Sequence, residues 1–162
     1  MGRYYPFFKA YDIRARVPDE IDDDVAYRIG RAFAAWLEPV AGAPGGTAAE
    51  GPGAFLPGAC ATVVVGRDMR LSSAGLADAL IEGLTEGGAD VLDIGLCGTE
   101  EVYYATFSER AGGGVMVTAR HNPRDYNGMK FVSEGARPIS ADTGLLDIEK
   151  MVYENRFPGA GR

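Results

Sequence analysis

The chain has 162 residues, of which 46% are hydrophobic and 24% are charged, a composition typical of one soluble globular domain. Its net charge of −7 opposes nucleic-acid binding, which depends on neutralising phosphates with lysine and arginine. No apolar run approaches the roughly 20 residues needed to cross a bilayer, and the N-terminus lacks the features of a signal peptide. We therefore expect a cytoplasmic protein with no nucleic-acid or membrane partner. Cys60 and Cys97 have no metal-ligand spacing and are interpreted as small buried residues.

Apolar periodicity and turn residues predict strands that alternate with helices. Asp22, Asp23 and Asp24 supply the cap and first-turn charge of the first helix, which Pro39 ends, and Ser72 or Ser73 opens the second, which Gly87 and Gly88 end. In chain order we predict an extended segment over 7–13, a helix over 25–38, a strand over 62–65, a helix over 73–86, a strand over 91–94, a helix capped by Thr99, strands over 115–118 and 129–132, and a helix over 142–155.

This alternation predicts an α/β fold, a three-layer α/β/α domain with a mixed central sheet, over residues 1–158. A Gly/Pro/Ala-rich stretch at 39–61 is predicted to be a surface loop, and 159–162 a flexible tail. Ligands of such sheets bind beyond the carboxyl ends of the strands, so the loops after Ile13, Val65 and Thr118 are expected to meet there.

The polar segment TARHNPRDYNGMK, residues 118–130, lies between two apolar strands and carries the most chemical information in the sequence. Asn122 before Pro123 predicts an extended or turn geometry, and Asn127-Gly128 predicts a tight turn that directs Lys130 back toward the start of the loop. His121 is the only histidine of the chain. Its type and neighbours leave a structural and a functional role equally open.

Four segments, FKAYDIRA, GRDMRLSS, IGLCGTEEVYYAT and GGVMVTARHNPRDYNGMKFVSEGARPISADTG, resemble the first domain of the alpha-D-phosphohexomutases, in particular the bacterial phosphomannomutases. The resemblance implies conversion between hexose 6-phosphate and hexose 1-phosphate through an enzyme phosphoserine, with Mg²⁺ as the cofactor of the full-length enzyme. It also implies that His121 and Lys130 orient the sugar and assist proton transfer. Tyr11, Arg14 and Asn122 match positions that border the same site.

The sequence departs from the family at Arg120, because the family pattern places its phosphoserine at this position in Thr-Ala-Ser-His-Asn-Pro. Arginine has no hydroxyl to accept a phosphoryl group and stays protonated. Its fixed positive charge also opposes a magnesium ion, so no metal site is expected to be complete in this chain. Three interpretations stay open: an engineered or mutated site in an ordinary mutase, a natural relative that binds sugar phosphates without converting them, or a displaced nucleophile at Thr118.

No segment resembles the three further domains of the family, so this chain alone is predicted to be inactive. Its expected partners are a hexose phosphate and those missing domains. The alternative is a non-catalytic sugar-phosphate-binding or interaction module derived from the family. A generic nucleotide-binding domain is disfavoured because neither a GxGxxG nor a GxxxxGK[ST] loop is present. Three further expectations are a structural ion pair between Asp68 and Arg70, a helix cap at 99–101, and core packing of Tyr103, Tyr104 and Phe107.

Overall fold

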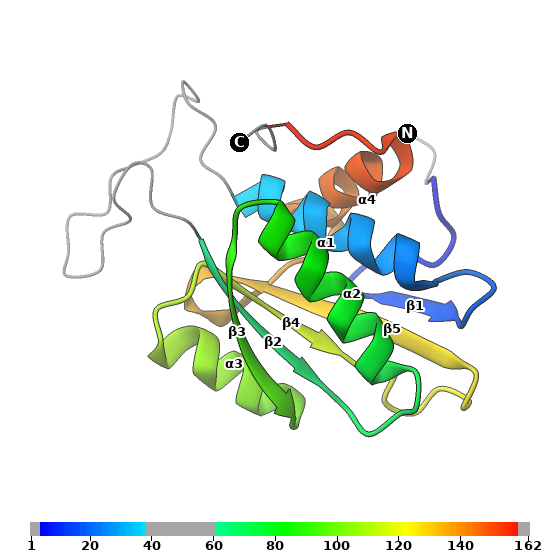
Figure 1. Cartoon of the computed structure of the whole chain (residues 1–162), viewed down its shortest axis with the longest axis horizontal. Coiled ribbons are helices and arrows are strands. Elements are labelled where there is room, and N and C mark those ends of the chain that lie inside the picture. Colours follow the sequence, from blue (N-terminus) through cyan, green and yellow to red (C-terminus); the bar gives the residue numbers. More distant parts are fainter. Residues whose placement is uncertain (1–3, 38–60, 159–162) are drawn as a thin grey trace.

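The computed structural model describes residues 4–37 and 61–158 as a sheet between two helical layers (Figure 1). Of the predicted loop at 39–61 only Ala61 is described; residues 39–60, Cys60 among them, and the tail at 159–162 lie outside the described residues. The strands are β1 (Ile13–Arg16), β2 (Thr62–Arg67), β3 (Asp90–Leu96), β4 (Gly113–Val117), β5 (Tyr126–Ser133) and β6 (Arg137–Pro138). The helices are α1 (Asp23–Leu37), α2 (Ser73–Glu86), α3 (Thr99–Ser108) and α4 (Leu145–Glu154), with short 3₁₀ turns η1 (Glu134–Ala136) and η2 (Ala141–Thr143).

The sheet is mixed, with the order β1-β5-β4-β2-β3 and with β6 paired to β5. β2 pairs in parallel with both β3 and β4, whereas β5 pairs antiparallel with both β4 and β1. β1, β2, β3 and β4 therefore run in one direction, and their carboxyl ends share one edge of the sheet. The predicted three-layer α/β/α architecture is confirmed.

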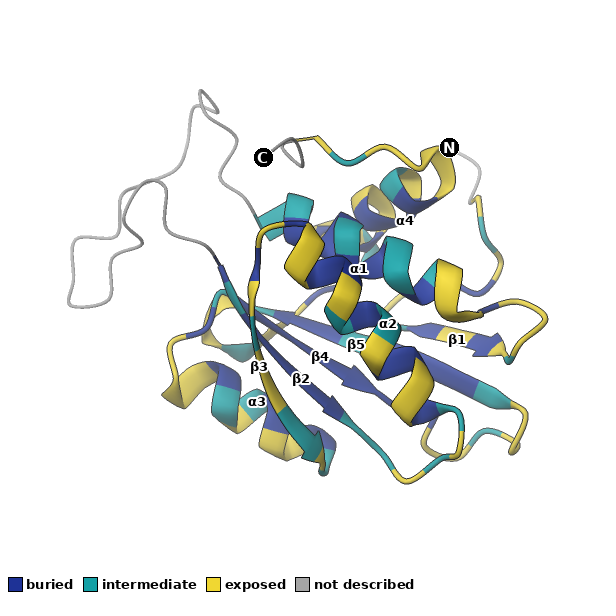
Figure 2. Ribbon diagram, viewed as in Figure 1, coloured by how far each residue is buried: buried dark blue, intermediate teal, exposed yellow. Residues whose placement is uncertain are grey.

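The larger core lies between the sheet and the layer formed by α1, α2 and α4, as the buried inner faces of these helices show (Figure 2). Phe33 of α1 packs at a ring distance of 5.2 Å on Phe131 of β5, which fixes the helix over the sheet. Gly30 and Gly83 let α1 and α2 touch, because a Cβ on Gly83 would lie 2.0 Å from the carbonyl oxygen of Tyr27. In the described part of the chain, no helix has the length and apolarity of a membrane span.

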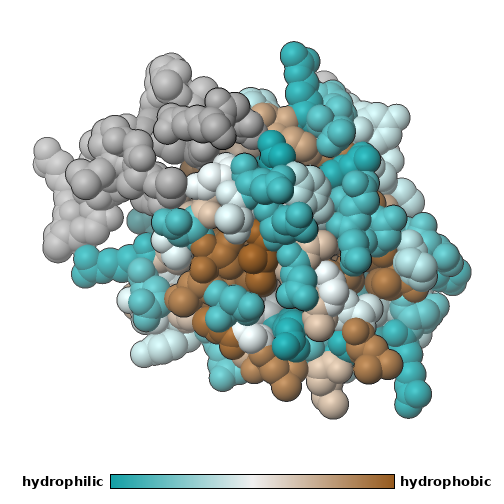
Figure 3. Space-filling view, viewed as in Figure 1, coloured by the Kyte–Doolittle hydropathy of each residue, from teal (hydrophilic) through white to brown (hydrophobic). Residues whose placement is uncertain are grey.

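The opposite face of the sheet is covered by α3, which packs Val102 against Val64 and Met116. The prediction that Tyr104 and Phe107 are core residues is wrong, since they are 73% and 67% exposed. Their side chains lie on the face of α3 that points away from the sheet, while Tyr103 is half-buried. Hydrophobic side chains also gather on the surface over β3 (Figure 3), where Leu92 and Leu96 are exposed on this edge strand.

Several predicted element boundaries need correction. The first strand is β1 and begins at Ile13, because Phe7 and Phe8 are buried in turns and only Phe8 forms a bridge. The last helix begins at Leu145 rather than Asp142, because Gly144 has a φ of +150°, which lies outside the helical range and separates η2 from α4. A side chain at Gly144 would clash with Trp36. Helix α3 is capped by the Glu101 carboxylate, which accepts a hydrogen bond from the N–H of Gly98, and not by Thr99.

Candidate functional site

Three loops meet at the carboxyl edge of the sheet, as predicted for the loops after β1, β2 and β4. The N–H of Val17, after β1, donates to the carbonyl oxygen of Asp125 at 2.8 Å, and the N–H of Asp68, after β2, donates to that of Val117 at 3.0 Å. The three loops line a groove of about 530 Å³. Its lining residues are Val17, Asp68, Met69, Arg70, Leu71, Ser72, Arg120, Asn122, Arg124 and Asp125.

The loop at 118–125 curls tightly before β5 begins. Within it the N–H of Asn122 donates to the carbonyl oxygen of Ala119 at 2.9 Å, and that of Tyr126 to the carbonyl oxygen of Pro123 at 3.0 Å. The side-chain amide of Asn122 also donates to Ala119, at 2.7 Å. Arg120 has a φ of +43°, a left-handed conformation that a side chain other than glycine rarely adopts. Such conformations persist where the surroundings enforce them and cluster at functional sites.

The predicted tight turn at Asn127-Gly128 is wrong, because both residues lie buried inside β5. Gly128 pairs with Arg14, and a Cβ on it would lie 1.9 Å from the carbonyl oxygen of Ile13. Glycine is therefore present for the close approach of β1 and not for a turn. The strand starts three residues earlier than predicted and carries Asn127 into the interior.

Asp68 organises the base of the loop through both carboxylate oxygens. One oxygen accepts hydrogen bonds from the N–H of Arg70 and the hydroxyl of Ser73, and the other accepts from the hydroxyl of Thr118 at 2.8 Å. The Thr118 oxygen in turn accepts from the N–H of Arg120 at 3.1 Å. A chain of hydrogen bonds thus joins the start of α2 to the backbone of residue 120.

The side-chain amide of Asn127 extends this network, donating to Ser72 at 2.8 Å and to Ser73 at 2.9 Å. The two serines therefore mark the start of α2, as predicted, but their hydroxyls serve the loop network and do not cap the helix. The sequence signal for this network is the polar run GRDMRLSS directly after a buried strand. The partners of these groups were not predicted.

Arg70 lies at the centre of the loop. The predicted ion pair with Asp68 is present at 3.7 Å between Nε and the carboxylate, but most of the guanidinium's hydrogen bonds go elsewhere. Its four terminal hydrogen bonds run to backbone carbonyl oxygens, three in the loop and one at the start of β5, namely those of Arg120, Asn122, Pro123 and Tyr126.

The side chain of Arg120 extends toward α3, where its guanidinium lies 3.3 Å from the carboxylate of Glu100. Burial raises the pKa of the nearby Tyr103 hydroxyl, the Arg120 charge opposes this shift, and Glu100 and Asp12 add to it. The charges of Arg120, Glu100 and Asp12 therefore all lie within electrostatic range of the Tyr103 hydroxyl. His121 and Arg120 are both exposed at the tip of the loop.

Lys130 lies on the α3 side of the sheet. Its partner on the neighbouring strand β4 is Met116, which packs against Val102 of α3. Arg14 pairs with Gly128, two residues from Lys130 along β5, so Arg14 and Lys130 share that face as diagonal neighbours. Arg14 also pairs with Asp12 at 2.9 Å. Tyr11 is exposed just before β1, and of the predicted residues only Arg120 and Asn122 line the groove itself.

Comparison with known proteins decides the family. The family model for "Phosphoglucomutase/phosphomannomutase, alpha/beta/alpha domain I" matches residues 6–158. The chain is 54% identical over 147 residues to a protein of Xanthomonas campestris named "Phosphohexose mutases" and 50% identical over 151 residues to the phosphomannomutase of Salmonella typhimurium. The chain belongs to the phosphoglucomutase/phosphomannomutase family and contains its domain I.

Solved structures agree with this assignment. A phosphoglucomutase/phosphomannomutase family protein from Burkholderia thailandensis matches 93% of the chain with a TM-score of 0.73 and 35% identity. This chain spans 30% of that structure, 28% of the Salmonella relative and 28% of the Xanthomonas relative. The family resemblance inferred from the sequence motifs is therefore confirmed, and the relatives' length leaves room for further domains.

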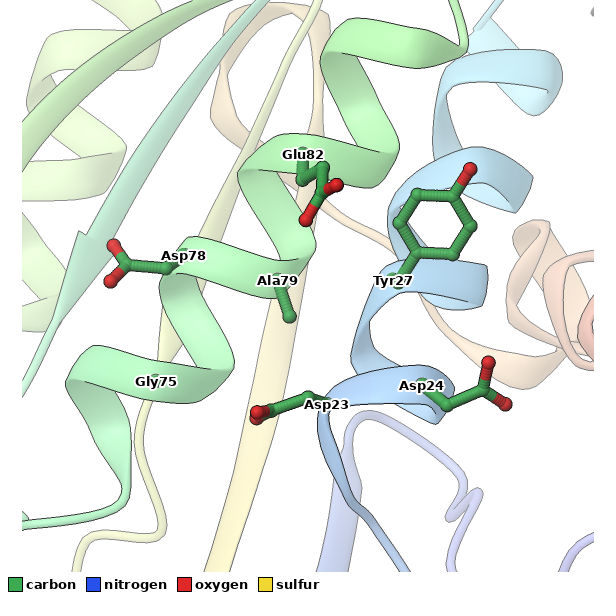
Figure 4. Close-up of a pocket in the computed structure, with 7 residues that line it drawn as sticks. All are labelled: Asp23, Asp24, Tyr27, Gly75, Asp78, Ala79 and Glu82. Atoms are coloured by element: carbon green, nitrogen blue, oxygen red, sulfur yellow. The ribbon is translucent and has the colours of Figure 1, made fainter.

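A second groove of this domain I, of about 550 Å³, lies between α1 and α2 (Figure 4). Asp23 and Asp24 come from α1, and Asp78 and Glu82 from α2. Four carboxylates repel an anionic ligand, so this groove does not suit a phosphate. Across residues 4–37 and 61–158, no group of three or more histidine, cysteine, aspartate or glutamate side chains could hold a metal ion.

Cys97 follows β3 on the same edge of the sheet and is half-buried. The buried-cysteine prediction is thus met only in part for this residue. Burial raises the pKa of its thiol, and the nearby Glu101 carboxylate adds to the shift. The thiol is therefore held in its protonated, less nucleophilic form.

Proposed function

We propose that this domain is the sugar-phosphate-binding first domain of a phosphohexomutase whose carrier position is occupied by Arg120. The observation that carries the proposal is the loop at 118–125, which is fixed at the carboxyl edge of the sheet and presents residue 120 from a left-handed backbone. Membership of the family supplies the reaction class, conversion between hexose 6-phosphate and hexose 1-phosphate. The substrate is a mannose or glucose phosphate.

The cationic side chains suit a phosphorylated ligand. Arg14 and Lys130 share the α3 side of the sheet, and Arg120 extends over the same side to Glu100. Guanidinium groups bind phosphate oxygens in a bidentate manner, and lysine binds them as a point charge. In this proposal His121 and Asn122 meet the sugar from the loop tip, and Tyr11 borders it.

Arg120 prevents the covalent step. Phosphoryl transfer through an enzyme-bound intermediate needs an oxygen nucleophile at the carrier position, and a guanidinium provides none. Thr118 is a poor substitute because it is 5% exposed and its hydroxyl is engaged by Asp68 and by the N–H of Arg120. We therefore propose that this chain binds sugar phosphate and does not convert it.

Magnesium, implied by the family for the full-length enzyme, does not fit the residues of this chain. In this proposal the fixed charge of Arg120 stands at the carrier position, and among the described residues no group of three or more histidine, cysteine, aspartate or glutamate side chains is arranged to hold a metal ion. Divalent magnesium prefers carboxylate, phosphate and water oxygens. No step of the proposed function is routed through the ion.

The second candidate is a non-catalytic binding or interaction module, favoured by the ion pair of Arg120 with Glu100. This pair gives the guanidinium a partner within the fold, which supports a role for Arg120 other than that of a lost carrier. In this case Arg120 is a functional part of the binding module, and Arg120→Ser brings back no mutase activity.

One pair of fusion proteins separates the two candidates. The chain, as it is and with Arg120→Ser, is joined to the remaining domains of the Salmonella relative and assayed for conversion of mannose 1-phosphate to mannose 6-phosphate. Turnover by the serine form alone supports a mutase domain without its carrier. If both fusions bind sugar phosphate but neither turns it over, the binding module is favoured, and turnover by the arginine form refutes the role assigned to position 120.

A further inference from the structure

The planar guanidinium of Arg70 binds the backbone of residues 120–126 at four points. Nη1 of Arg70 donates to the carbonyl oxygens of Pro123 at 2.6 Å and Tyr126 at 3.0 Å, and Nη2 donates to those of Arg120 at 2.8 Å and Asn122 at 2.6 Å. These four carbonyls come from seven consecutive residues, 120–126. The loop therefore curls around the guanidinium with its carbonyl oxygens turned inward.

The remaining donor of Arg70 is also directed at the protein. Its Nε lies 3.7 Å from the carboxylate of Asp68, the residue that also holds Thr118 and Ser73. A guanidinium has five N–H donors in a fixed planar fork. Four of them donate to carbonyl oxygens of residues 120–126 and the fifth, on Nε, lies within ion-pair distance of Asp68, so the guanidinium is engaged by the protein although Arg70 lines the groove.

We propose that Arg70 is the positioning residue of the candidate site: it fixes the curl of residues 120–126 and so determines where Arg120, His121 and Asn122 present their side chains. The carbonyl of Arg120 is held by Arg70 and its N–H by Thr118, which pins the left-handed backbone from both sides. The effect on the loop stands independently of the ligand, and only the effect on affinity rests on the proposed function.

A lysine cannot replace this arginine. An ammonium group carries three donors on one nitrogen and acts as a point charge, so it cannot reach four carbonyls spread across a fork. Arg70→Lys therefore keeps the charge and loses the geometry, and Arg70→Met loses both. Arg28→Met is the matched control, because Arg28 lies on α1 and its one ion pair among the described residues is with the exposed Asp24 at 2.9 Å.

The first measurement is amide hydrogen exchange on the four proteins, read at Asn122 and Tyr126, whose N–H groups close the loop's own turns. In both Arg70 variants we expect exchange at these two amides to accelerate about tenfold or more, while exchange at Val64 and Val115 in the central strands stays unchanged. The second measurement is the dissociation constant of mannose 6-phosphate, expected to rise roughly fivefold in both variants because the site is no longer pre-organised. The control is expected to match the parent chain in both.

Each outcome bears on the proposal. Unchanged loop exchange in Arg70→Met overturns it, as does full retention of both properties in Arg70→Lys, which would make the charge alone sufficient. Weaker binding with unchanged loop exchange would make Arg70 a direct phosphate ligand and equally overturns it. If Arg70→Met does not fold, the lysine variant carries the test. If the parent chain binds no mannose 6-phosphate, the proposed function fails while the exchange measurement still decides the role of Arg70.

Discussion

The carboxylate of Glu100 and the guanidinium of Arg120 form an ion pair at 3.3 Å that joins the first turn of α3 to the tip of the candidate loop. Glu100 is 82% exposed, so the pair lies in water and is weak. A phosphate that reaches Arg120 has to compete with this carboxylate. If Arg120 meets the ligand as proposed, Glu100 weakens the binding of a phosphate to this guanidinium.

Replacing Glu100 with glutamine is therefore expected to strengthen binding of mannose 6-phosphate. Exposed ion pairs are worth about 0.2–1 kcal/mol, which corresponds to a gain in affinity of roughly 1.4-fold to fivefold. Titration followed by NMR measures it at two salt concentrations, and the gain should shrink at the higher one because salt screens the charges. Glu109→Gln, at the other end of α3, is the control and should leave affinity unchanged. Weaker binding in Glu100→Gln would mean that Glu100 contacts the ligand itself.

The contact between α1 and α2 predicts opposite effects for two alanine substitutions in one helix. Gly83→Ala places a Cβ 2.0 Å from the carbonyl oxygen of Tyr27, so the helices must separate, and overpacking of this kind costs about 1–3 kcal/mol. Gly75→Ala meets nothing closer than a side-chain atom at 3.7 Å, and alanine's higher helix propensity should stabilise the fold by up to about 1 kcal/mol. Urea unfolding of both variants measures the difference. Equal stabilities would show that the two helices do not touch at Gly83.

The fold was predictable because its signals are local. The run of three valines at 63–65 and the spacing of Ile29 and Phe33 predict a strand and a helix without reference to the rest of the chain. The meeting of the loops at one edge follows from the parallel strands, and the structure confirms it. The family motifs added the domain assignment.

What could not be predicted depends on contacts between distant residues. Asn127-Gly128 has the local pattern of a turn, yet the carbonyl of Ile13, more than a hundred residues earlier, makes glycine necessary inside a strand. Tyr104 and Phe107 have the composition of core residues, but the side of α3 that meets the sheet is already filled by Val102 and Thr106. The acceptors around Arg70 are backbone carbonyl oxygens, which every residue has, so no residue type in the sequence indicates them.

The structural role of the Thr118 hydroxyl predicts a clear difference between two variants. Thr118→Val removes the group that donates to Asp68 and accepts from the N–H of Arg120, and leaves polar atoms without partners, at a cost of about 1–3 kcal/mol. Thr118→Ser keeps the hydroxyl and should cost less. Thermal unfolding compares them. A valine variant as stable as the parent chain would show that the hydroxyl does not hold the loop.

Cys97 is expected to react slowly with alkylating reagents, because burial raises the pKa of its thiol and the thiolate is the nucleophile. The measurement is the rate of iodoacetamide labelling against pH in a Cys60→Ser background, with an unfolded sample as the reference. At about pH 8 the folded protein should react more slowly than the unfolded chain, and the midpoint of its pH profile should be shifted upward. A midpoint below that of the unfolded chain would contradict the burial effect.

The central claim, that the loop at 118–125 binds a sugar phosphate, is tested most directly by NMR titration of the ¹⁵N-labelled chain with mannose 6-phosphate. The largest shift changes are expected at the amides of Ala119, Arg120, His121 and Asn122, with smaller ones at Arg14 and Lys130 across the neighbouring strands. Inorganic sulfate at equal ionic strength separates specific binding from a salt effect. Changes confined to other surfaces, such as the groove between α1 and α2, or no saturable change at all, would contradict the claim.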